Sequence, residues 1–177
     1  MNNSIDIYPQ PLRLKNQHQV RSCNIKINSL ENSIEKELWY ELPESLQLPD
    51  DDNCDAYLLA TLLPAMKLNC NIKVHGNVSK KLLANLTELQ LIWSKWCPET
   101  YNVINIYVTK TVVREQTAEK TIIAFSGGVD ATFTAYRHAK NLAGYANKSI
   151  EAGVLIHGFG IRLEDSIGFL DTAKKAE

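Results

Sequence analysis

Residues 124–139 read AFSGGVDATFTAYRHA, and this stretch decides the fold class of the C-terminal part of the chain. The preceding run, residues 121–125, is apolar and rich in β-branched side chains, which is typical of a central parallel strand. From Ala131 onward, apolar residues recur at helical spacing through Phe133 and Tyr136. The pattern therefore predicts a strand, a glycine-rich loop and a helix, in that order.

This order suits phosphate binding, because a helix N-terminus offers unpaired N–H groups and the positive end of its dipole. Gly127 and Gly128 can adopt a positive φ and leave no Cβ between the amides and the phosphate oxygens. Ser126 adds a hydroxyl donor, and Asp130 is a candidate either to cap the helix or to hold Mg²⁺. A bare Ser-Gly-Gly tripeptide fits a tight turn equally well.

Two other nucleotide-binding loops are excluded by the residues after the second glycine. A Walker A loop ends in Gly-Lys-Ser/Thr, whereas Val129, Asp130 and Ala131 stand here. A dinucleotide-binding fold needs G-x-G-x-x-G, which this stretch does not contain.

The longer stretch 124–139 resembles the PP-loop signature of the adenine nucleotide alpha hydrolase superfamily, whose usual form is S-G-G-x-D-S. The resemblance implies an α/β fold in which a doubly wound parallel sheet is flanked by helices. It implies that residues 126–130 (Ser126, Gly127, Gly128, Val129 and Asp130) bind the pyrophosphate of ATP, with Mg²⁺ held at Asp130. It also implies an ATP pyrophosphatase that adenylates a carbonyl or carboxylate oxygen before a nitrogen or sulfur nucleophile attacks.

The chain departs from this signature in two ways. Ala131 stands where the signature has serine, so one hydroxyl near the phosphates is missing. Residues 121–177 hold only the start of a doubly wound sheet, which normally has about five or six strands. Three explanations of this short domain are open: a fragment of a longer protein, a truncated chain completed by another chain, and a degenerate copy. Lys174 and Lys175 suit the C-terminus of a helix and favour a true structural end.

Four segments are expected along the chain. Residues 1–18 are polar and contain two prolines, which favours a loose N-terminal arm or an edge strand. Residues 19–110 look like a small α+β module, and residues 111–120 are a polar linker. Residues 121–177 are the partial PP-loop nucleotide-binding domain.

Within the module, alternating apolar and polar residues predict an antiparallel pair of strands at 20–27 and 37–42. Further strands are expected at 71–75, where a turn at Gly76 and Asn77 ends the strand, and at 103–108. Residues 49–53 have the composition of a turn, and Asp52, Asn53 or Asp55 is the candidate cap of the helix that follows. A second helix is capped by Ser79. The first helix is defined by Ala56, Leu59, Leu62, Leu63 and Met66, and the second by Leu82, Leu86, Leu89, Trp93 and Trp96.

Composition excludes several classes of protein. The formal net charge is −1, which gives no evidence for nucleic-acid binding. The sequence has neither an apolar run long enough to span a membrane nor a signal peptide, so a cytoplasmic protein is expected. The four cysteines form no C-x-x-C pair, which favours reduced thiols over a zinc site. The acidic segment near Asp52 lacks the glycine and distal glutamate of an EF-hand, which favours a turn and cap over calcium.

Other candidate residues follow the loop. A second parallel strand is expected at 153–157, and His157 at its end is either a general acid or base or, more simply, a structural histidine. The structural interpretation is stronger still for His75. Arg162 and Arg137 are candidate phosphate contacts, although Arg137 lies two turns into the helix. Glu164 and Asp165 are better placed to cap a following helix than to bind metal.

These observations lead to one hypothesis and one rival. The hypothesis is an ATP-dependent ligase that adenylates a small metabolite ahead of amide, nitrile or thio-group formation, with catalytic residues of the second step unassigned. Its partners would be a nucleotide and a small-molecule substrate, with a homo-oligomer or a completing chain as further options. The rival is a non-catalytic interaction module in which residues 20–108 do the work and the loop is a remnant.

Overall fold

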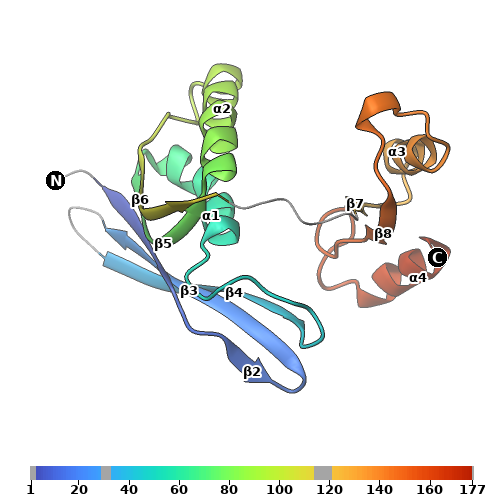
Figure 1. Ribbon diagram of the computed structural model, residues 1–177, viewed down its shortest axis with the longest axis horizontal. Coiled ribbons are helices and arrows are strands. Elements are labelled where there is room, and N and C mark those ends of the chain that lie inside the picture. The colour runs from blue at the N-terminus through green and yellow to red at the C-terminus, as the bar shows by residue number, and fades with distance from the viewer. Residues whose placement is uncertain (1–2, 29–32, 114–120, 177) are drawn as a thin grey trace. The chain divides into compact units, whose positions relative to one another are not determined.

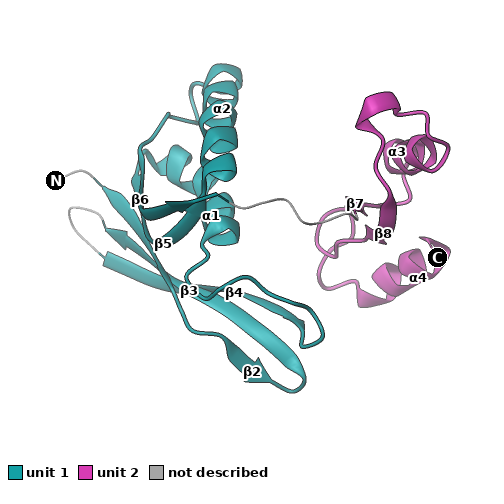
Figure 2. Ribbon diagram, in the orientation of Figure 1, with its two compact units in different colours: residues 1–114 teal, residues 115–177 magenta. Residues whose placement is uncertain are grey.

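The computed structural model describes residues 3–28, 33–113 and 121–176, and it is a mixed α/β protein (Figure 1). It divides into two compact units, residues 1–114 and residues 115–177 (Figure 2). Of the predicted linker 111–120, residues 111 and 112 belong to a strand and residues 114–120 lie outside the described part of the chain. In the described ranges, no helix has the length and hydropathy that crossing a bilayer requires.

Unit 1 combines one mixed β-sheet with two helices. The strands described are β1 (Ser4–Pro9), β2 (Arg13–Lys15), β3 (His18–Asn28), β4 (Ser33–Pro43), β5 (Asn71–Ser79) and β6 (Ile106–Val112), and the helices are α1 (Asp55–Leu68) and α2 (Lys80–Trp96). The sheet order is β2-β3-β1-β5-β6, with β4 also paired to β3. Because β4 pairs along the whole of β3, β1 and β2 must lie end to end on the opposite edge of β3.

The prediction of a loose arm at 1–18 is wrong for residues 4–9. This segment forms β1, which lies inside the sheet, antiparallel to β3 on one side and parallel to β5 on the other. Ile5 and Ile7 alternate along β1 and are almost fully buried, at 1% and 0% exposure. Two apolar positions are too few to reveal a strand by periodicity, so its pairing with distant partners decides its structure. Residues 13–15 do form an edge strand.

The predicted antiparallel pair is confirmed, and both strands are longer than expected. β3 and β4 pair from His18 opposite Pro43 to Asn28 opposite Ser33. Leu38 and Tyr40 of β4 pack against the core, as do Ile25 and Ile27 of β3. Successive side chains of a strand point to opposite faces. The polar side chains that alternate with these residues, such as Glu37 and Glu41, therefore lie on the other face of the strand pair.

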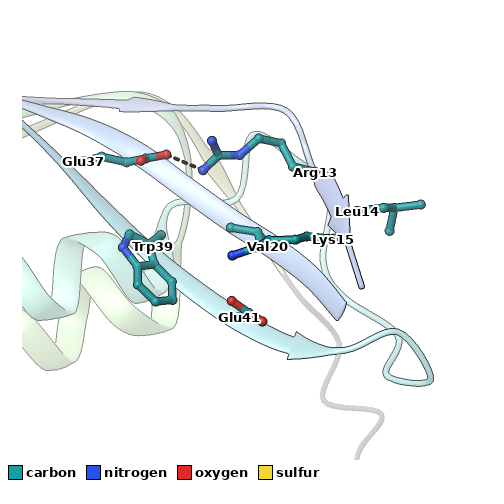
Figure 3. Close-up of a pocket in the computed structure, with 7 residues that line it drawn as sticks. All are labelled: Arg13, Leu14, Lys15, Val20, Glu37, Trp39 and Glu41. Carbon is teal, nitrogen blue, oxygen red and sulfur yellow. Dashed lines mark hydrogen bonds and ion pairs between the residues drawn. The ribbon is translucent and has the colours of Figure 1, made fainter. Parts of the chain in front are cut away.

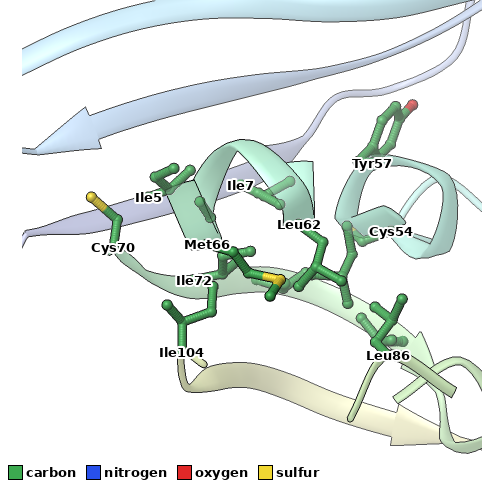
Figure 4. Packing of buried hydrophobic residues seen from close by; sticks show 14 of the residues in the cluster. Ile5, Ile7, Cys54, Tyr57, Leu62, Met66, Cys70, Ile72, Leu86 and Ile104 are labelled. Atoms are coloured by element: carbon green, nitrogen blue, oxygen red, sulfur yellow. The ribbon is translucent and has the colours of Figure 1, made fainter. Parts of the chain in front are cut away.

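The core of unit 1 lies between the sheet and the two helices, which cover the same face of it (Figure 1). Leu62 and Met66 of α1 meet Ile72 of β5 and Leu86 of α2 in one buried cluster (Figure 4), to which Leu58 also belongs. Both predicted helices are confirmed, but the buried stripe of α1 is rotated from the expected one. Leu59 is 53% exposed, whereas Tyr57, Leu58, Thr61 and Ala65 are buried. An almost uniformly apolar helix gives periodicity little power to choose its buried face.

The predicted turn at Gly76 and Asn77 is wrong, because β5 continues to Ser79. The pairing of β5 with β6 shifts register between Val74 and Asn77, as at a β-bulge. The Asn77 backbone then bonds to the segment before α1: its N–H donates to the Asp52 carbonyl over 2.7 Å, and its carbonyl accepts from the Cys54 N–H over 2.9 Å. Ser79 caps α2 as expected, accepting from the Leu82 N–H over 3.2 Å.

The acidic segment 50–52 is held by a buried arginine. The Arg21 side chain is 8% exposed, and its Nη1 lies 2.5 Å from Oδ1 of Asp51. The same guanidinium donates to the carbonyls of Pro49 and Asp50. Asn53 then accepts from the Asp55 N–H over 3.0 Å, which confirms the turn. The predicted cap of α1 by Asp52, Asn53 or Asp55 is wrong, because the N-cap is Cys54 and no side chain caps this helix end. In the part of the chain that the structure describes, no group of three or more His, Cys, Asp or Glu residues is arranged to hold a metal.

Unit 2 contains the predicted strand, loop and helix. Its elements are β7 (Thr121–Ala124), α3 (Val129–Ala139), the 3₁₀ turn Gly144–Ala146, β8 (Ile150–Val154) and α4 (Ser166–Ala176). β7 and β8 are parallel. β8 begins and ends earlier than the predicted 153–157, because β7, its partner, ends at Ala124. No residue of 121–176 is classed as buried, so this unit presents much apolar surface.

Gly76 should tolerate no larger residue. A Cβ at this position would lie 2.5 Å from the Asp52 carbonyl oxygen and 2.6 Å from Sγ of Cys54. We expect Gly76→Ala to lower the free energy of unfolding by about 1–3 kcal/mol, since the segment before α1 must move. Urea denaturation measures this change. Gly160→Ala is the control, because a Cβ there meets nothing within 4 Å; equal stability of the two variants would contradict the packing of Gly76.

Two cysteines of the core should resist alkylation. Burial, and then the nearby Cys54, raises the pKa of Cys23 to about 12, and burial followed by Asp52 does the same for Cys54. Relative to a thiol of pKa 9.0, the thiolate fraction at neutral pH falls about a thousandfold. Iodoacetamide followed by mass spectrometry should therefore label Cys97, which is not buried, well before Cys23 or Cys54. Comparable rates in the native protein would be inconsistent with this burial, and addition of urea should equalise them.

Candidate phosphate-binding loop and adjoining cavity

The loop between β7 and α3 is shaped by its two glycines. Gly127 has φ 74°, a left-handed conformation that costs an L-residue with a side chain about 1–2 kcal/mol. Gly128 has φ −73° and ψ 168° and is the N-cap of α3. A Cβ built on Gly127 would meet nothing within 4 Å, so the space above this residue is open. The glycine requirement at 127 therefore comes from the backbone bend.

The predicted binding residues Ser126, Gly127, Gly128, Val129 and Asp130 lie together on this loop and the first turn of α3, and all are exposed. The Gly128 N–H has a long contact of 3.4 Å with Oγ of Ser126. The Thr132 N–H donates to the Gly128 carbonyl over 3.0 Å, as expected for the first hydrogen bond of a helix with Gly128 as its N-cap. The preceding amides of a helix have no acceptor within it. They are therefore available to an anion in front of the loop.

Asp130 does not cap α3. The N-cap is Gly128, and no side chain caps this end of the helix. Among the residues that the structure describes, Asp130 has no hydrogen-bond or ion-pair partner. Magnesium in phosphate-transfer sites is bound by one or two carboxylates together with substrate phosphates. A single free carboxylate beside the loop fits that arrangement, whereas it cannot form an all-protein metal cage.

A cavity of about 500 Å³ adjoins the loop at the carboxyl ends of β7 and β8. Ser126 belongs to both the loop and the cavity wall, and Phe125 lies beside it. The remaining wall is mostly apolar and comes from Ala124, Val154, Leu155, Ile156, Phe159, Gly160, Ile161 and Thr172. In open α/β sheets, ligands bind outside the carboxyl ends of the strands. The cavity occupies that position.

Phe159, Ile161 and Thr172 are cavity residues that the sequence alone did not identify. Phe159 is 87% exposed, although it is a large apolar side chain. The available signal was the apolar run Val154, Leu155 and Ile156 followed by two glycines around Phe159. That signal marks a strand end but does not show which side chains turn toward a cavity.

His157 has a structural role in this arrangement. Its Nε2 lies 2.8 Å from the Arg162 carbonyl, and its ring stacks on Phe169 of α4 with centroids 4.4 Å apart. Since a carbonyl only accepts, Nε2 carries the proton of this bond. The histidine thus ties residues 157–162 to α4, which favours the structural interpretation over an acid or base.

The remaining candidates of unit 2 make local contacts or are exposed to solvent. Nη2 of Arg137 donates to the Leu142 carbonyl over 3.4 Å, and its guanidinium lies over the Phe133 ring. Arg137 therefore makes a local contact with the residues that follow the C-terminal end of α3. The side chain of Arg162 is exposed. Oδ1 of Asp165 accepts from the Gly168 N–H over 2.9 Å, which confirms its predicted capping role.

In unit 1, His75 is also bound to a neighbour. Its Nε2 lies 2.8 Å from Oδ1 of Asp6, and its ring stacks on Tyr8 with centroids 4.1 Å apart. The Asp6 side chain is 9% exposed and accepts two further bonds, from the Ser4 hydroxyl and the Asn28 amide. A buried carboxylate with this many donors is satisfied. The group therefore fastens β1 to β3 and β5.

Loss of the Asp165 cap should loosen α4. We expect Asp165→Ala to destabilise this helix by about 1 kcal/mol, because the Gly168 N–H loses its acceptor. Hydrogen exchange of the α4 amides, followed by NMR, should become several-fold faster. Glu164→Ala removes the adjacent carboxylate as a control and should leave exchange unchanged. Identical exchange in the two variants would rule out the cap.

Comparison with known proteins assigns no family to the chain. No protein-family model, curated protein or solved structure matches it.

Proposed function

We propose that the chain is an ATP-binding protein of the PP-loop class and that unit 2 is the start of a doubly wound parallel sheet of the adenine nucleotide alpha hydrolase type. In this proposal it adenylates a small metabolite with release of pyrophosphate, ahead of amide, nitrile or thio-group formation. The main support for this proposal is one observation. The left-handed bend at Gly127 leads directly into the uncapped N-terminus of α3, and a cavity lies beside it at the carboxyl ends of β7 and β8.

The pyrophosphate of ATP would lie on the main-chain amides of residues 127–130. These residues are exposed, and they lie at the N-terminal end of α3, where the helix dipole is positive. The Ser126 hydroxyl would add a side-chain donor. Gly127 leaves that space open because it has no Cβ.

Asp130 would hold Mg²⁺ together with the phosphate oxygens. Its carboxylate is exposed, lies in the first turn of α3 and has no protein partner among the described residues. The bound ion supplies charge neutralisation for the phosphates. The chain's own contribution is one oxygen ligand and the position of that ligand relative to the loop amides.

The cavity beside Ser126 has room for the rest of a nucleotide or for part of a second substrate. Its volume of about 500 Å³ lies within the range of roughly 300–1,000 Å³ that is usual for small-molecule sites. Its mostly apolar wall would suit a planar base. The residues that would catalyse the second step are not assigned, because His157 is engaged with Arg162 and Phe169.

Ala131 would weaken binding without abolishing it. A serine at this position would add one hydroxyl to the phosphate or metal site. Loss of a hydrogen bond to a charged group weakens binding by roughly 1.5–3 kcal/mol, which is about tenfold or more in affinity. The amide of residue 131 is retained, so the main-chain part of the site is unaffected.

A non-catalytic interaction module is the second candidate. It is favoured by Ala131 and by the absence of any buried residue among the described residues of unit 2, whereas unit 1 has a packed core. A unit with so little core would depend on a completing chain, a further part of its own chain or a second copy for stability. For either function we propose a cytoplasmic protein, since Cys23, Cys54, Cys70 and Cys97 are all free thiols.

Isothermal titration of the full chain with ATP tests the proposed function. We expect binding that requires Mg²⁺, and we expect AMP plus pyrophosphate to compete. Asp130→Asn should weaken ATP binding about tenfold and remove its dependence on Mg²⁺, because the variant lacks the anionic metal ligand. Glu164→Gln, which changes an exposed carboxylate outside the loop, should bind as the parent chain does.

Two results would count against the enzyme. No heat with any of these ligands at millimolar concentration would favour the interaction module. Binding of ATP whose Mg²⁺ dependence survives in Asp130→Asn would remove Asp130 from the site.

A further inference from the structure

Unit 1 contains a cavity of its own, about 390 Å³ in volume, on the face of the sheet formed by β2, β3 and β4 (Figure 3). It is lined by Arg13, Leu14, Lys15, Val20, Glu37, Trp39 and Glu41. Leu38 and Tyr40, which alternate with these β4 residues, pack toward the core. The cavity therefore lies on the face of β4 that the core does not cover.

The cavity is shaped before any ligand arrives. β2 and β3 are joined by a two-residue turn at Asn16 and Gln17, with φ 49° and 63°. Two positive φ values are typical of the type I′ turn, which fixes the register of a hairpin. This register sets Lys15 opposite His18 and Arg13 opposite Val20. The positions of the side chains around the cavity thus follow from main-chain pairing.

Arg13 is already neutralised. Its Nη2 lies 2.5 Å from Oε1 of Glu37 and donates to the Ser22 hydroxyl over 3.3 Å. These contacts link β2 to β4 across β3 (Figure 3). The guanidinium and the Glu37 carboxylate form a wall of the cavity, and their opposite charges offset each other.

Two further residues of opposite charge line the cavity. Lys15 has no hydrogen-bond or ion-pair partner within the described ranges, and Glu41 has only a contact of 3.9 Å with Nδ1 of His18. They form no ion pair with each other. In Figure 3, the Lys15 side chain extends toward Trp39, with the Glu41 carboxylate on the same side. A ligand that carries both charges could be bound between them.

Trp39 supplies the apolar part of the site. It is 54% exposed on a polar strand face, which leaves a large aromatic surface in water. Val20 extends this surface toward β2. Aromatic rings in a ligand pair favourably with an indole in stacked or edge-to-face arrangements.

We propose that this cavity binds an α-amino acid as its zwitterion, with an aromatic or large apolar side chain. The ligand carboxylate pairs with the Lys15 ammonium, the ligand ammonium pairs with the Glu41 carboxylate, and the side chain covers Trp39. A polyanion fits poorly because Glu37 and Glu41 line the same space. This site lies wholly in unit 1 and does not depend on the proposed nucleotide chemistry of unit 2.

Titration calorimetry of the full chain with L-phenylalanine tests the proposal. We expect saturable binding in the millimolar range or tighter. Phenylalaninamide lacks the carboxylate and N-acetylphenylalanine lacks the ammonium, and each should bind about tenfold more weakly because one charge-assisted bond is lost. Equal affinity for all three compounds, or no binding of phenylalanine at tens of millimolar, would overturn the proposal.

Variants locate the binding site. Lys15→Gln should weaken the binding of phenylalanine about tenfold, and this variant should no longer distinguish phenylalanine from phenylalaninamide. Glu41→Gln should weaken the binding of phenylalanine to a similar extent and should no longer distinguish it from N-acetylphenylalanine. Lys36→Gln, an exposed lysine on the other face of β4, is the matched control and should bind normally. Unchanged affinity in Lys15→Gln or Glu41→Gln would sink the assignment. ATP binding in Lys15→Gln should stay as in the parent chain, so a failure here is distinguishable from a failure of the proposed function.

Discussion

The pairing of β1 on both sides holds unit 1 together. β1 runs antiparallel to β3 and parallel to β5, so it joins the long β3–β4 hairpin to the β5–α2–β6 segment. On one face, Ile5 and Ile7 enter the buried cluster with α1. On the other face, Asp6 is bonded to His75 of β5 and Asn28 of β3. Main-chain pairing, apolar burial and a buried polar group therefore connect the same strands, and the sheet face that carries Trp39 depends on that frame.

Unit 2 obtains its local structure in another way. With no buried residue in its described part, the loop at 126–130 depends on backbone conformation and short-range hydrogen bonds rather than on a packed core. Gly127 supplies the bend, and His157 and Asp165 organise the residues before α4. Within the ranges that the structure describes, β7 and β8 pair only with each other. A loop of this kind can keep its shape while the surrounding sheet is small, although its affinity for a ligand still depends on how rigidly the sheet holds it.

Local patterns predicted well where neighbours in sequence determine the structure. The β3–β4 pair, the Ser79 cap and the order of strand, loop and helix at 121–139 all depend on alternation, capping and glycine chemistry. β1 could not be found this way, since its two isoleucines are buried by partners far along the chain. The turn predicted at Gly76 is wrong for a related reason. A glycine required by a turn and a glycine required by close contact with another backbone segment cannot be distinguished in sequence. The cavity wall at Phe159 likewise depends on how a loop folds back, which periodicity does not encode.

The two candidate sites differ in how their residues are distributed along the sequence, and for this reason only the phosphate-binding loop could be proposed from sequence. A phosphate site made of main-chain amides needs glycine at the bend, so the proposed site leaves a short contiguous signature, and Ala131 still supplies its main-chain N–H although it lacks the hydroxyl. The cavity around Trp39 is made of side chains from three strands, brought together by the turn at Asn16 and Gln17. Its residues are separated in sequence by up to 28 positions, from 13 to 41. Only the strand register places Lys15 and Glu41 around one space, and that register follows from the turn at Asn16 and Gln17 and from the pairing of β3 with β4.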